Sequence, residues 1–176
     1  MGAKTMEIVA YNSSKDQEFK KFIEEIEKES ERGMAIICHA YIEDLLKEIL
    51  KKRLIKDKDF LKNLEWLSFS RLLTLCYITG IVTKEEKKEI KLLTKIRNKF
   101  AHKRKANSFR IDNIPDLCNE LRIPRSFTGV STSRKKYIRT AAYYIQILNL
   151  KLKYTKKVRF VEEESPELKL LDNLYV

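Results

Sequence analysis

The sequence is poor in the two residues that most often interrupt helices. Its 176 residues include four glycines and three prolines, so few positions favour the tight turns that connect short strands. Apolar residues instead recur every three or four positions, as at Ile37, Tyr41, Leu45 and Ile49, which is typical of the buried face of a helix. We therefore expect an all-α fold, a single-domain helical bundle of about five to six helices with a long C-terminal helix.

The same periodicity, together with capping residues, places the expected helices along the chain. Thr83 and Glu86 have the spacing of a capping box, which opens a helix, and Gly80 suits the left-handed cap that closes one. Gly33 separates the first two apolar helices, and Pro124 follows a short one. We expect helices from residue 14 through Ile26, from Gly33 to Leu50, from Ser68 to Gly80, from Thr83 to Phe100, around 114–121 and from about Ser133 to Val158, with an irregular charged segment over 56–67.

The chain has about the length of one domain, and we expect its two ends to lie outside the bundle. Residues 1–13 lack a strong helical period and predict a flexible N-terminal arm. Residues 14–160 carry the periodic segments and form the helical bundle domain. Residues 161–176 carry Glu162, Glu163 and Glu164 near their start and end in a small apolar patch, which predicts an acidic and then apolar C-terminal tail.

The charge of the chain favours an anionic partner. It has 37 Lys and Arg against 25 Asp and Glu, a net charge of +12. A field of this sign attracts polyanions and speeds their encounter with the protein. Nucleic acid is the leading candidate, although many lysine-rich proteins are simply soluble.

Several classes of protein are excluded by what the sequence lacks. Cys38, Cys76 and Cys118 are odd in number and widely spaced, so they indicate neither a disulfide framework nor a zinc site. Four glycines cannot supply a phosphate-binding loop, and no run of about 18 apolar residues is present. We therefore expect a cytoplasmic protein that makes no membrane contact, holds no metal and needs no cofactor.

The stretch from Lys95 to His102 reads Lys-Ile-Arg-Asn-Lys-Phe-Ala-His and ends an expected helix. Arginine binds phosphate oxygens through a planar fork, and histidine exchanges protons near neutral pH. RNA cleavage without metal needs both, because protons move to and from the reacting oxygens while charge builds on the phosphate. We therefore take Arg97, Asn98 and His102 as candidate catalytic residues, with Asn98 orienting the phosphate or the imidazole.

Both chemical residues also have structural alternatives. Five helical steps separate Arg97 from His102, which places them about 140° apart around the helix. They converge only if the helix ends near Phe100 or a second subunit completes the site. His102 would equally suit the cap of a helix C-terminus, and Arg97 would equally suit a salt bridge with Glu29 or Glu31.

Two groups of cations are candidate nucleic-acid contacts. They are Lys99, Lys103, Arg104 and Lys105 near the end of that helix, and Arg134, Lys135, Lys136 and Arg139 at the start of the last one. Tyr137, Tyr143 and Tyr144 interleave the second group and could stack on unpaired bases, although tyrosines at helical spacing are also typical of a core or interface. His39 lies between core positions, so we expect it to be an interior or interface residue without a chemical role.

These motifs, in this order, resemble the mannitol-repressor (MltR-like) family from about residue 20 to 155. The residues that carry the resemblance are Glu29-Ser30-Glu31-Arg32-Gly33, Phe69-Ser70-Arg71, Gly80, Ile96 to His102, Ser108-Phe109 and Cys118. The Arg-Asn-x-x-x-His segment is also similar to the signature of the broader HEPN superfamily. Many of these helical domains are metal-independent endoribonucleases used as toxins or in defence.

The resemblance implies a function and partners. It implies a HEPN-type metal-independent endoribonuclease that cleaves RNA, as a homodimer that brings two copies of the motif into one cleft. The alternative is a mannitol-repressor-like transcriptional regulator that acts mainly through protein contacts, without catalysis. An antitoxin or a regulatory protein would be the protein partner. Direct reading of duplex DNA is not expected, because no helix-turn-helix with a basic recognition helix is evident.

Overall fold

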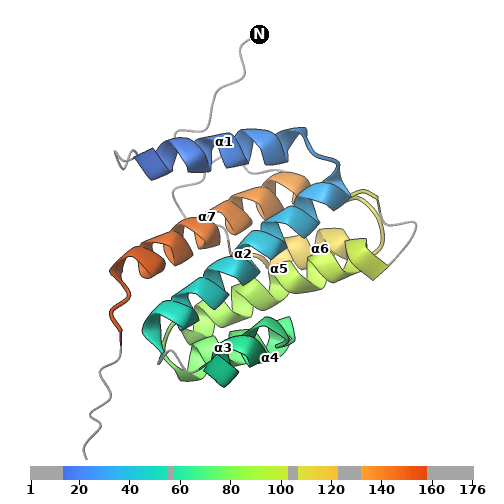
Figure 1. Cartoon of the computed structure of the whole chain (residues 1–176). Coiled ribbons are helices and arrows are strands. Elements are labelled where there is room, and N and C mark those ends of the chain that lie inside the picture. Colours follow the sequence, from blue (N-terminus) through green and yellow to red (C-terminus); the bar gives the residue numbers. More distant parts are fainter. Residues whose placement is uncertain (1–13, 55–57, 103–106, 123–131, 158–176) are drawn as a thin grey trace, which may run out of the picture.

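The computed structural model of the chain describes residues 14–54, 58–102, 107–122 and 132–157. Within these residues every regular element is a helix, so the expected all-α fold is confirmed (Figure 1). The helices are α1 (Ser14–Lys28), α2 (Glu31–Arg53), α3 (Lys58–Glu65), α4 (Phe69–Ile78), α5 (Lys84–His102), α6 (Ile114–Glu120) and α7 (Ser133–Tyr154). The expected N-terminal arm and C-terminal tail lie outside the described residues.

Helices α2, α5 and α7 form the centre of the bundle. α2 and α7 run parallel: the Tyr137 hydroxyl donates to the Ala35 carbonyl near their starts, at 3.1 Å, and Lys52 Nζ donates to the Leu152 carbonyl near their ends, at 2.7 Å. α5 runs in the opposite direction beside them, with α1 on one side of this layer and α3 and α4 on the other (Figure 1). The C-terminal end of α5 therefore lies beside the first half of α2.

An aromatic cluster closes the core at this end of α5. The rings of Phe100 and Phe109 have centroids 4.8 Å apart, and those of Phe109 and Tyr137 are 5.3 Å apart. All three side chains are at most 2% exposed. Burying rings of this size is among the largest single contributions to a core, so the cluster fixes the last turns of α5 against α7.

The predicted caps around Gly80 are confirmed. Gly80 has φ of 70°, the left-handed conformation that glycine adopts without strain. Thr83 and Glu86 form the reciprocal capping box, with N–H to carboxylate at 2.7 Å and N–H to hydroxyl at 3.2 Å. The same Glu86 carboxylate accepts from Lys151 Nζ at 2.6 Å, which ties the start of α5 to the end of α7.

Several helix boundaries differ from the expected ones, among them the start of α2 and the end of α7. α2 begins before Gly33, because the Ser30 hydroxyl caps it by accepting the Gly33 N–H at 3.0 Å. A Cβ atom at Gly33 would lie 2.7 Å from Glu29 Oε2, so the glycine permits close packing in the first turn and does not break the helix. α7 ends at Tyr154 and not at Val158, since the next residue is extended.

The prediction of an irregular segment over 56–67 is wrong for residues 58–65, which form α3. Leu64 is fully buried, and Phe60, one turn earlier, packs against the core. Lys51 of α2 forms an ion pair with Glu65 at the end of α3. Phe60, Leu61 and Leu64 are the apolar residues of this helix, which has only eight residues, so its stability depends on tertiary packing more than on sequence pattern.

Glu89 of α5 is a buried carboxyl group with incomplete hydrogen bonding. It is 1% exposed, and its Oε2 accepts the backbone N–H of Arg122 at 3.0 Å. Its Oε1 has no hydrogen-bond partner within the described parts of the chain. Burial raises the pKa of Glu89 above its ordinary value of 4.5, against the opposing effect of the Arg122 N–H.

We expect Glu89→Gln to raise the melting temperature by a few degrees at neutral pH. The folded state keeps the Glu89 proton to a higher pH than the unfolded state, so the free energy of unfolding falls as pH rises from about 4.5 through the folded pKa. Glutamine keeps the acceptor for Arg122 and has no charge to bury. Thermal unfolding at about pH 4 and about pH 7 checks this, with Glu120→Gln as the exposed control. A gap between variant and wild type that does not widen with pH would contradict it.

Candidate functional site

The proposed catalytic residues lie in the last turns of α5. This helix continues without a break to His102, so it does not end near Phe100. Side chains five residues apart on a continuous helix leave it about 140° apart. Arg97 and His102 of one chain therefore leave α5 on different sides, and the condition that remains for their convergence is a second copy of the chain.

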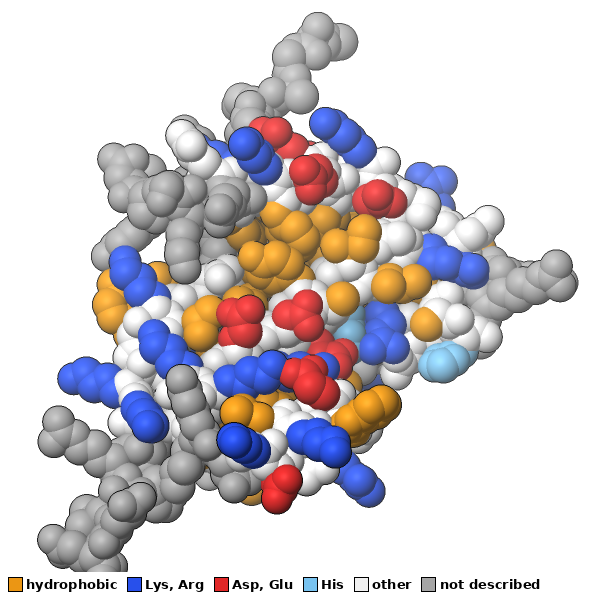
Figure 2. Space-filling view, in the orientation of Figure 1, with side chains coloured by type: hydrophobic (Ala, Val, Ile, Leu, Met, Phe, Trp, Pro, Cys, Tyr) orange, Lys and Arg blue, Asp and Glu red, His pale blue; other side chains and the backbone are white. Residues whose placement is uncertain are grey.

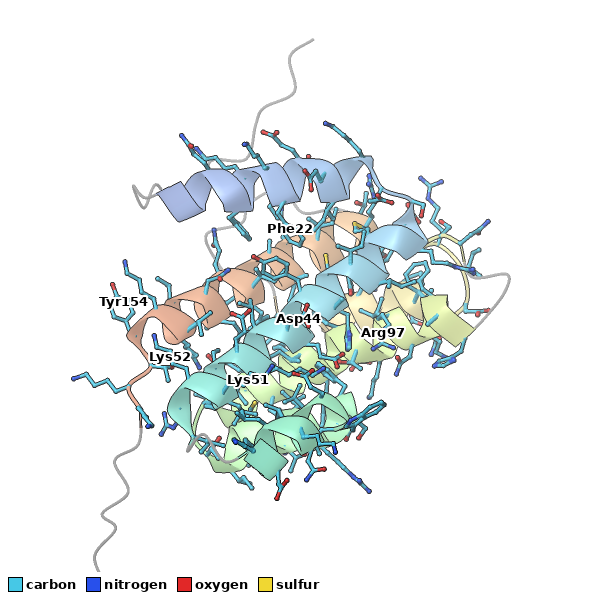
Figure 3. All side chains as sticks on the ribbon, viewed as in Figure 1. Phe22, Asp44, Lys51, Lys52, Arg97 and Tyr154 are labelled. Atoms are coloured by element: carbon cyan, nitrogen blue, oxygen red, sulfur yellow. The ribbon has the colours of Figure 1, made fainter. Side chains whose placement is uncertain are left out.

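Arg97 is held by two uncharged side chains where α5 passes α2 (Figure 3). Its Nη2 lies 2.9 Å from Nδ1 of His39, and its Nη1 donates to Oδ1 of Asn98 at 2.9 Å. Neither partner neutralises the guanidinium, which is half-buried. Asn98 thus orients the guanidinium, whereas the sequence predicts that it orients the phosphate or the imidazole. Glu31, a salt-bridge candidate for Arg97 from sequence, accepts the Phe109 N–H at 2.5 Å.

His39 is an interior residue, as expected, but it takes part in the site. It is 2% exposed, and its ring centroid lies 4.2 Å from that of Phe69. Burial, and then the charge of Arg97, lower the pKa of His39 to about 3. The imidazole is therefore neutral at physiological pH. Arg97 Nη2 also lies 3.4 Å from Nε2 of the same ring, so the nitrogen that accepts its N–H depends on the tautomer.

His102 is the C-terminal residue of α5, and it is exposed. A histidine at this place also interacts favourably with the helix dipole when it is protonated, so the capping alternative remains compatible with its position. Lys99, three residues earlier, is half-buried. Lys103, Arg104 and Lys105 lie outside the described residues.

Two cations of the second group contact neighbouring helices. Arg134 Nη2 donates to the Glu27 carbonyl near the end of α1, at 2.8 Å. Lys136 Nζ donates to Oδ1 of Asn119 in α6, at 2.6 Å. These contacts give both side chains a structural task, and they leave Lys135 as the exposed member of this group.

The tyrosines of α7 do not form an exposed stacking surface. Tyr137 is fully buried and Tyr144 is 7% exposed, while Tyr143 is half-buried with its ring 5.3 Å from that of Tyr144. The alternative given from sequence, a core role, therefore holds for Tyr137 and Tyr144. Arg139 is half-buried as well, so this helix offers little surface on which unpaired bases could stack.

A cavity of about 420 Å³ lies at the other end of the bundle. It is lined by Glu48, Lys51, Lys52, Leu54, Leu152 and Lys157. Figure 3 shows Lys51 and Lys52 near the ends of α2 and α7, well away from Arg97. Lys51 pairs with Glu65 and Lys52 binds carbonyls at the end of α7, so two of its lysines are already engaged in joining helix ends.

The described residues form neither a metal-binding cluster nor a membrane-crossing helix. In that part of the chain no three or more His, Cys, Asp or Glu side chains gather as a metal ion would require. None of the described helices combines the length and the apolar character needed to cross a membrane.

Comparisons of the chain with protein-family models, with curated proteins and with solved structures find no match. The resemblance to the mannitol-repressor and HEPN families therefore stays a prediction that rests on the motifs.

Proposed function

We propose that the protein is a HEPN-type metal-independent endoribonuclease of the toxin or defence type, in which Arg97, Asn98 and His102 act on single-stranded RNA. The observation that carries this proposal is that both hydrogen-bond partners of Arg97 are uncharged. Its partners are an imidazole and an amide, so the guanidinium keeps its charge, and it retains N–H donors beyond those two bonds. A guanidinium in this state is suited to bind a phosphate through paired hydrogen bonds.

The reaction follows from these groups. The ribose 2′-oxygen attacks the adjacent phosphorus and gives its proton to a neutral imidazole, while the bond from phosphorus to the 5′-oxygen breaks. The imidazolium formed in this way gives its proton to that 5′-oxygen. Arg97 stabilises the charge that builds on the non-bridging oxygens. The products are a 2′,3′-cyclic phosphate and a 5′-hydroxyl, with no net change in protons.

A homodimer would supply what one chain lacks. Arg97 and His102 of one chain leave α5 on different sides, so a second copy would bring its His102 to the Arg97 of the first. The exposed face of α2 supports a second copy at this place, because it carries Ile36, Ile37 and Ala40, with Ile36 42% and Ile37 38% exposed. Ile36 lies one turn before His39. Figure 2 shows hydrophobic side chains in orange between α1 and α2 and along α2, on the same face as the pale-blue histidine atoms.

We expect Ile36→Glu to dissociate the dimer and to abolish RNA cleavage. A charge placed in an apolar interface costs several kcal/mol when it finds no partner. Sedimentation velocity gives the mass of the variant, and the cleavage assay gives its activity. Leu150→Glu is the matched control, since Leu150 is 47% exposed on α7. A variant that stays dimeric, or a monomer with full activity, would count against this interface.

The nuclease itself is tested by incubating labelled single-stranded RNA with the protein in EDTA. We expect fragments that end in a 2′,3′-cyclic phosphate and begin with a 5′-hydroxyl. The same oligonucleotide with 2′-O-methyl groups stays intact, because no 2′-hydroxyl is free to attack. Cleavage that needs a divalent cation, or that proceeds on the methylated RNA, would rule out this mechanism.

Trp66 favours the alternative of a regulator that acts through protein contacts without catalysis. It is 83% exposed at the turn after α3, and tryptophan is enriched at the centres of protein interfaces. A regulator predicts that Trp66→Ala abolishes binding of an antitoxin or regulatory protein encoded nearby, whereas His102→Ala leaves the cellular phenotype unchanged. A phenotype lost with His102→Ala favours the nuclease.

A further inference from the structure

We infer that His39 is a positioning residue, which fixes the Arg97 guanidinium from the interior of the bundle and leaves its charge free for a phosphate. The inference rests on the proposed function, since it concerns the same site. It adds a residue that lies on another helix, outside the Arg-Asn-x-x-x-His motif.

His39 is tightly packed in the interior of the bundle. Its ring is 2% exposed on the core side of α2 and packs at 4.2 Å from the ring of Phe69, at the start of α4. A free arginine side chain has many rotamers, and fixing them costs about 2 kcal/mol. The 2.9 Å contact to the fixed ring restricts Arg97 before any ligand arrives, so less of this cost falls on binding.

The His39 imidazole that holds Arg97 is uncharged. A carboxylate at the same place would hold the guanidinium at least as firmly, but it would occupy the fork and cancel the attraction for phosphate. His39 stays neutral because it is buried and lies next to a cation. Asn98 restrains the other end of the fork with a neutral amide oxygen. Both restraints therefore leave the net positive charge in place.

A purely structural tie between α2 and α5 is the competing explanation, and it predicts a different pattern of variants. Asn places an amide oxygen close to the position of His39 Nδ1, so His39→Asn keeps a neutral acceptor. His39→Asp has nearly the same shape and adds a negative charge. His39→Leu removes the acceptor but suits an apolar interior. If His39 only joins α2 to α5, both His39→Asn and His39→Asp should keep RNA binding. If His39 is a neutral anchor for Arg97, only His39→Asn should keep it.

The test measures binding of a single-stranded 2′-O-methyl RNA, which cannot be cleaved, by titration at several salt concentrations. We expect His39→Asn to bind like wild type, and His39→Asp and His39→Leu to bind about tenfold more weakly, close to Arg97→Ala. The salt dependence of His39→Asp should fall by about one phosphate contact. Gln17→Glu, on an exposed face of α1, controls for the change in net charge. Thermal melts confirm that each variant folds.

Each outcome decides the inference. Binding by His39→Asp equal to wild type overturns the neutral anchor, and binding by His39→Leu equal to wild type overturns any positioning role. If His39→Asp does not fold, the RNA affinities of His39→Asn and His39→Leu are compared instead. If both variants bind RNA equally weakly, the hydrogen-bond acceptor at this position has no role. Wild-type protein that binds RNA in this pattern but never cleaves it contradicts the nuclease alone. Wild-type protein that does not bind RNA contradicts both proposals.

Discussion

Replacing His102 with alanine is expected to reduce the rate of RNA cleavage by about 10²–10⁴-fold while leaving the melting temperature unchanged. The reason is that His102 lies exposed at the end of α5, so its removal takes away a proton-transfer group and no buried contact. Single-turnover cleavage of labelled RNA in EDTA gives the rate, and a thermal melt gives the stability. Equal cleavage by the variant and by wild type would refute a catalytic role for His102.

Two further variants on α5 separate the role of the motif from general electrostatics. Arg97→Ala is expected to slow cleavage by about 10²–10³-fold and also to weaken RNA binding. Unlike His102→Ala, it should lower the melting temperature, because it leaves the buried imidazole of His39 without its partner. Lys95→Ala is the matched control, since Lys95 is an exposed cation on the same helix outside the motif. Loss of activity in Lys95→Ala would point to general electrostatics and not to the motif.

Replacing Phe100 with alanine is expected to cost about 3–5 kcal/mol of the free energy of unfolding. Its ring is fully buried against Phe109, and the residues around it are too well packed to collapse into the space left behind. The expected loss is a large part of the stability of a domain of this size. Urea unfolding followed by circular dichroism measures it.

Phe100→Leu separates volume from hydrophobicity at this position. It keeps an apolar side chain and should cost only about 1–1.5 kcal/mol. Both variants are expected to slow RNA cleavage, because Phe100 lies between Arg97 and His102 on α5 and anchors that end of the helix. A loss below about 1 kcal/mol for Phe100→Ala would mean that the aromatic cluster does not fix the end of α5.

The fold class follows from features that are local in the sequence. The periodicity of α2, α5 and α7 and the scarcity of glycine and proline are enough to predict a helical bundle. The capping box at Thr83 and Glu86 and the left-handed Gly80 are also local, since each depends on residues within one or two turns. α3 escapes prediction because its one fully buried residue, Leu64, gains its stability from tertiary contacts.

The candidate site is predictable only in part, for a physical reason. Arg97, Asn98 and His102 are recognisable because they share one segment. The partner of Arg97 is 58 residues away in the chain, and only the packing of α2 against α5 brings it close. Likewise, the seven-residue spacing of Tyr137 and Tyr144 places both on one face of α7, but only the packing of the bundle decides that this face belongs to the core.

We propose that Arg97 of one chain and His102 of another surround the same phosphate. Co-refolding an equal mixture of Arg97→Ala and His102→Ala tests this arrangement, with RNA cleavage in EDTA as the readout. Half of the dimers formed are mixed, and each mixed dimer carries one intact site. We expect the mixture to recover about a quarter of the wild-type rate, although neither variant cleaves alone. A mixture that contains mixed dimers and stays as inactive as its components would contradict it.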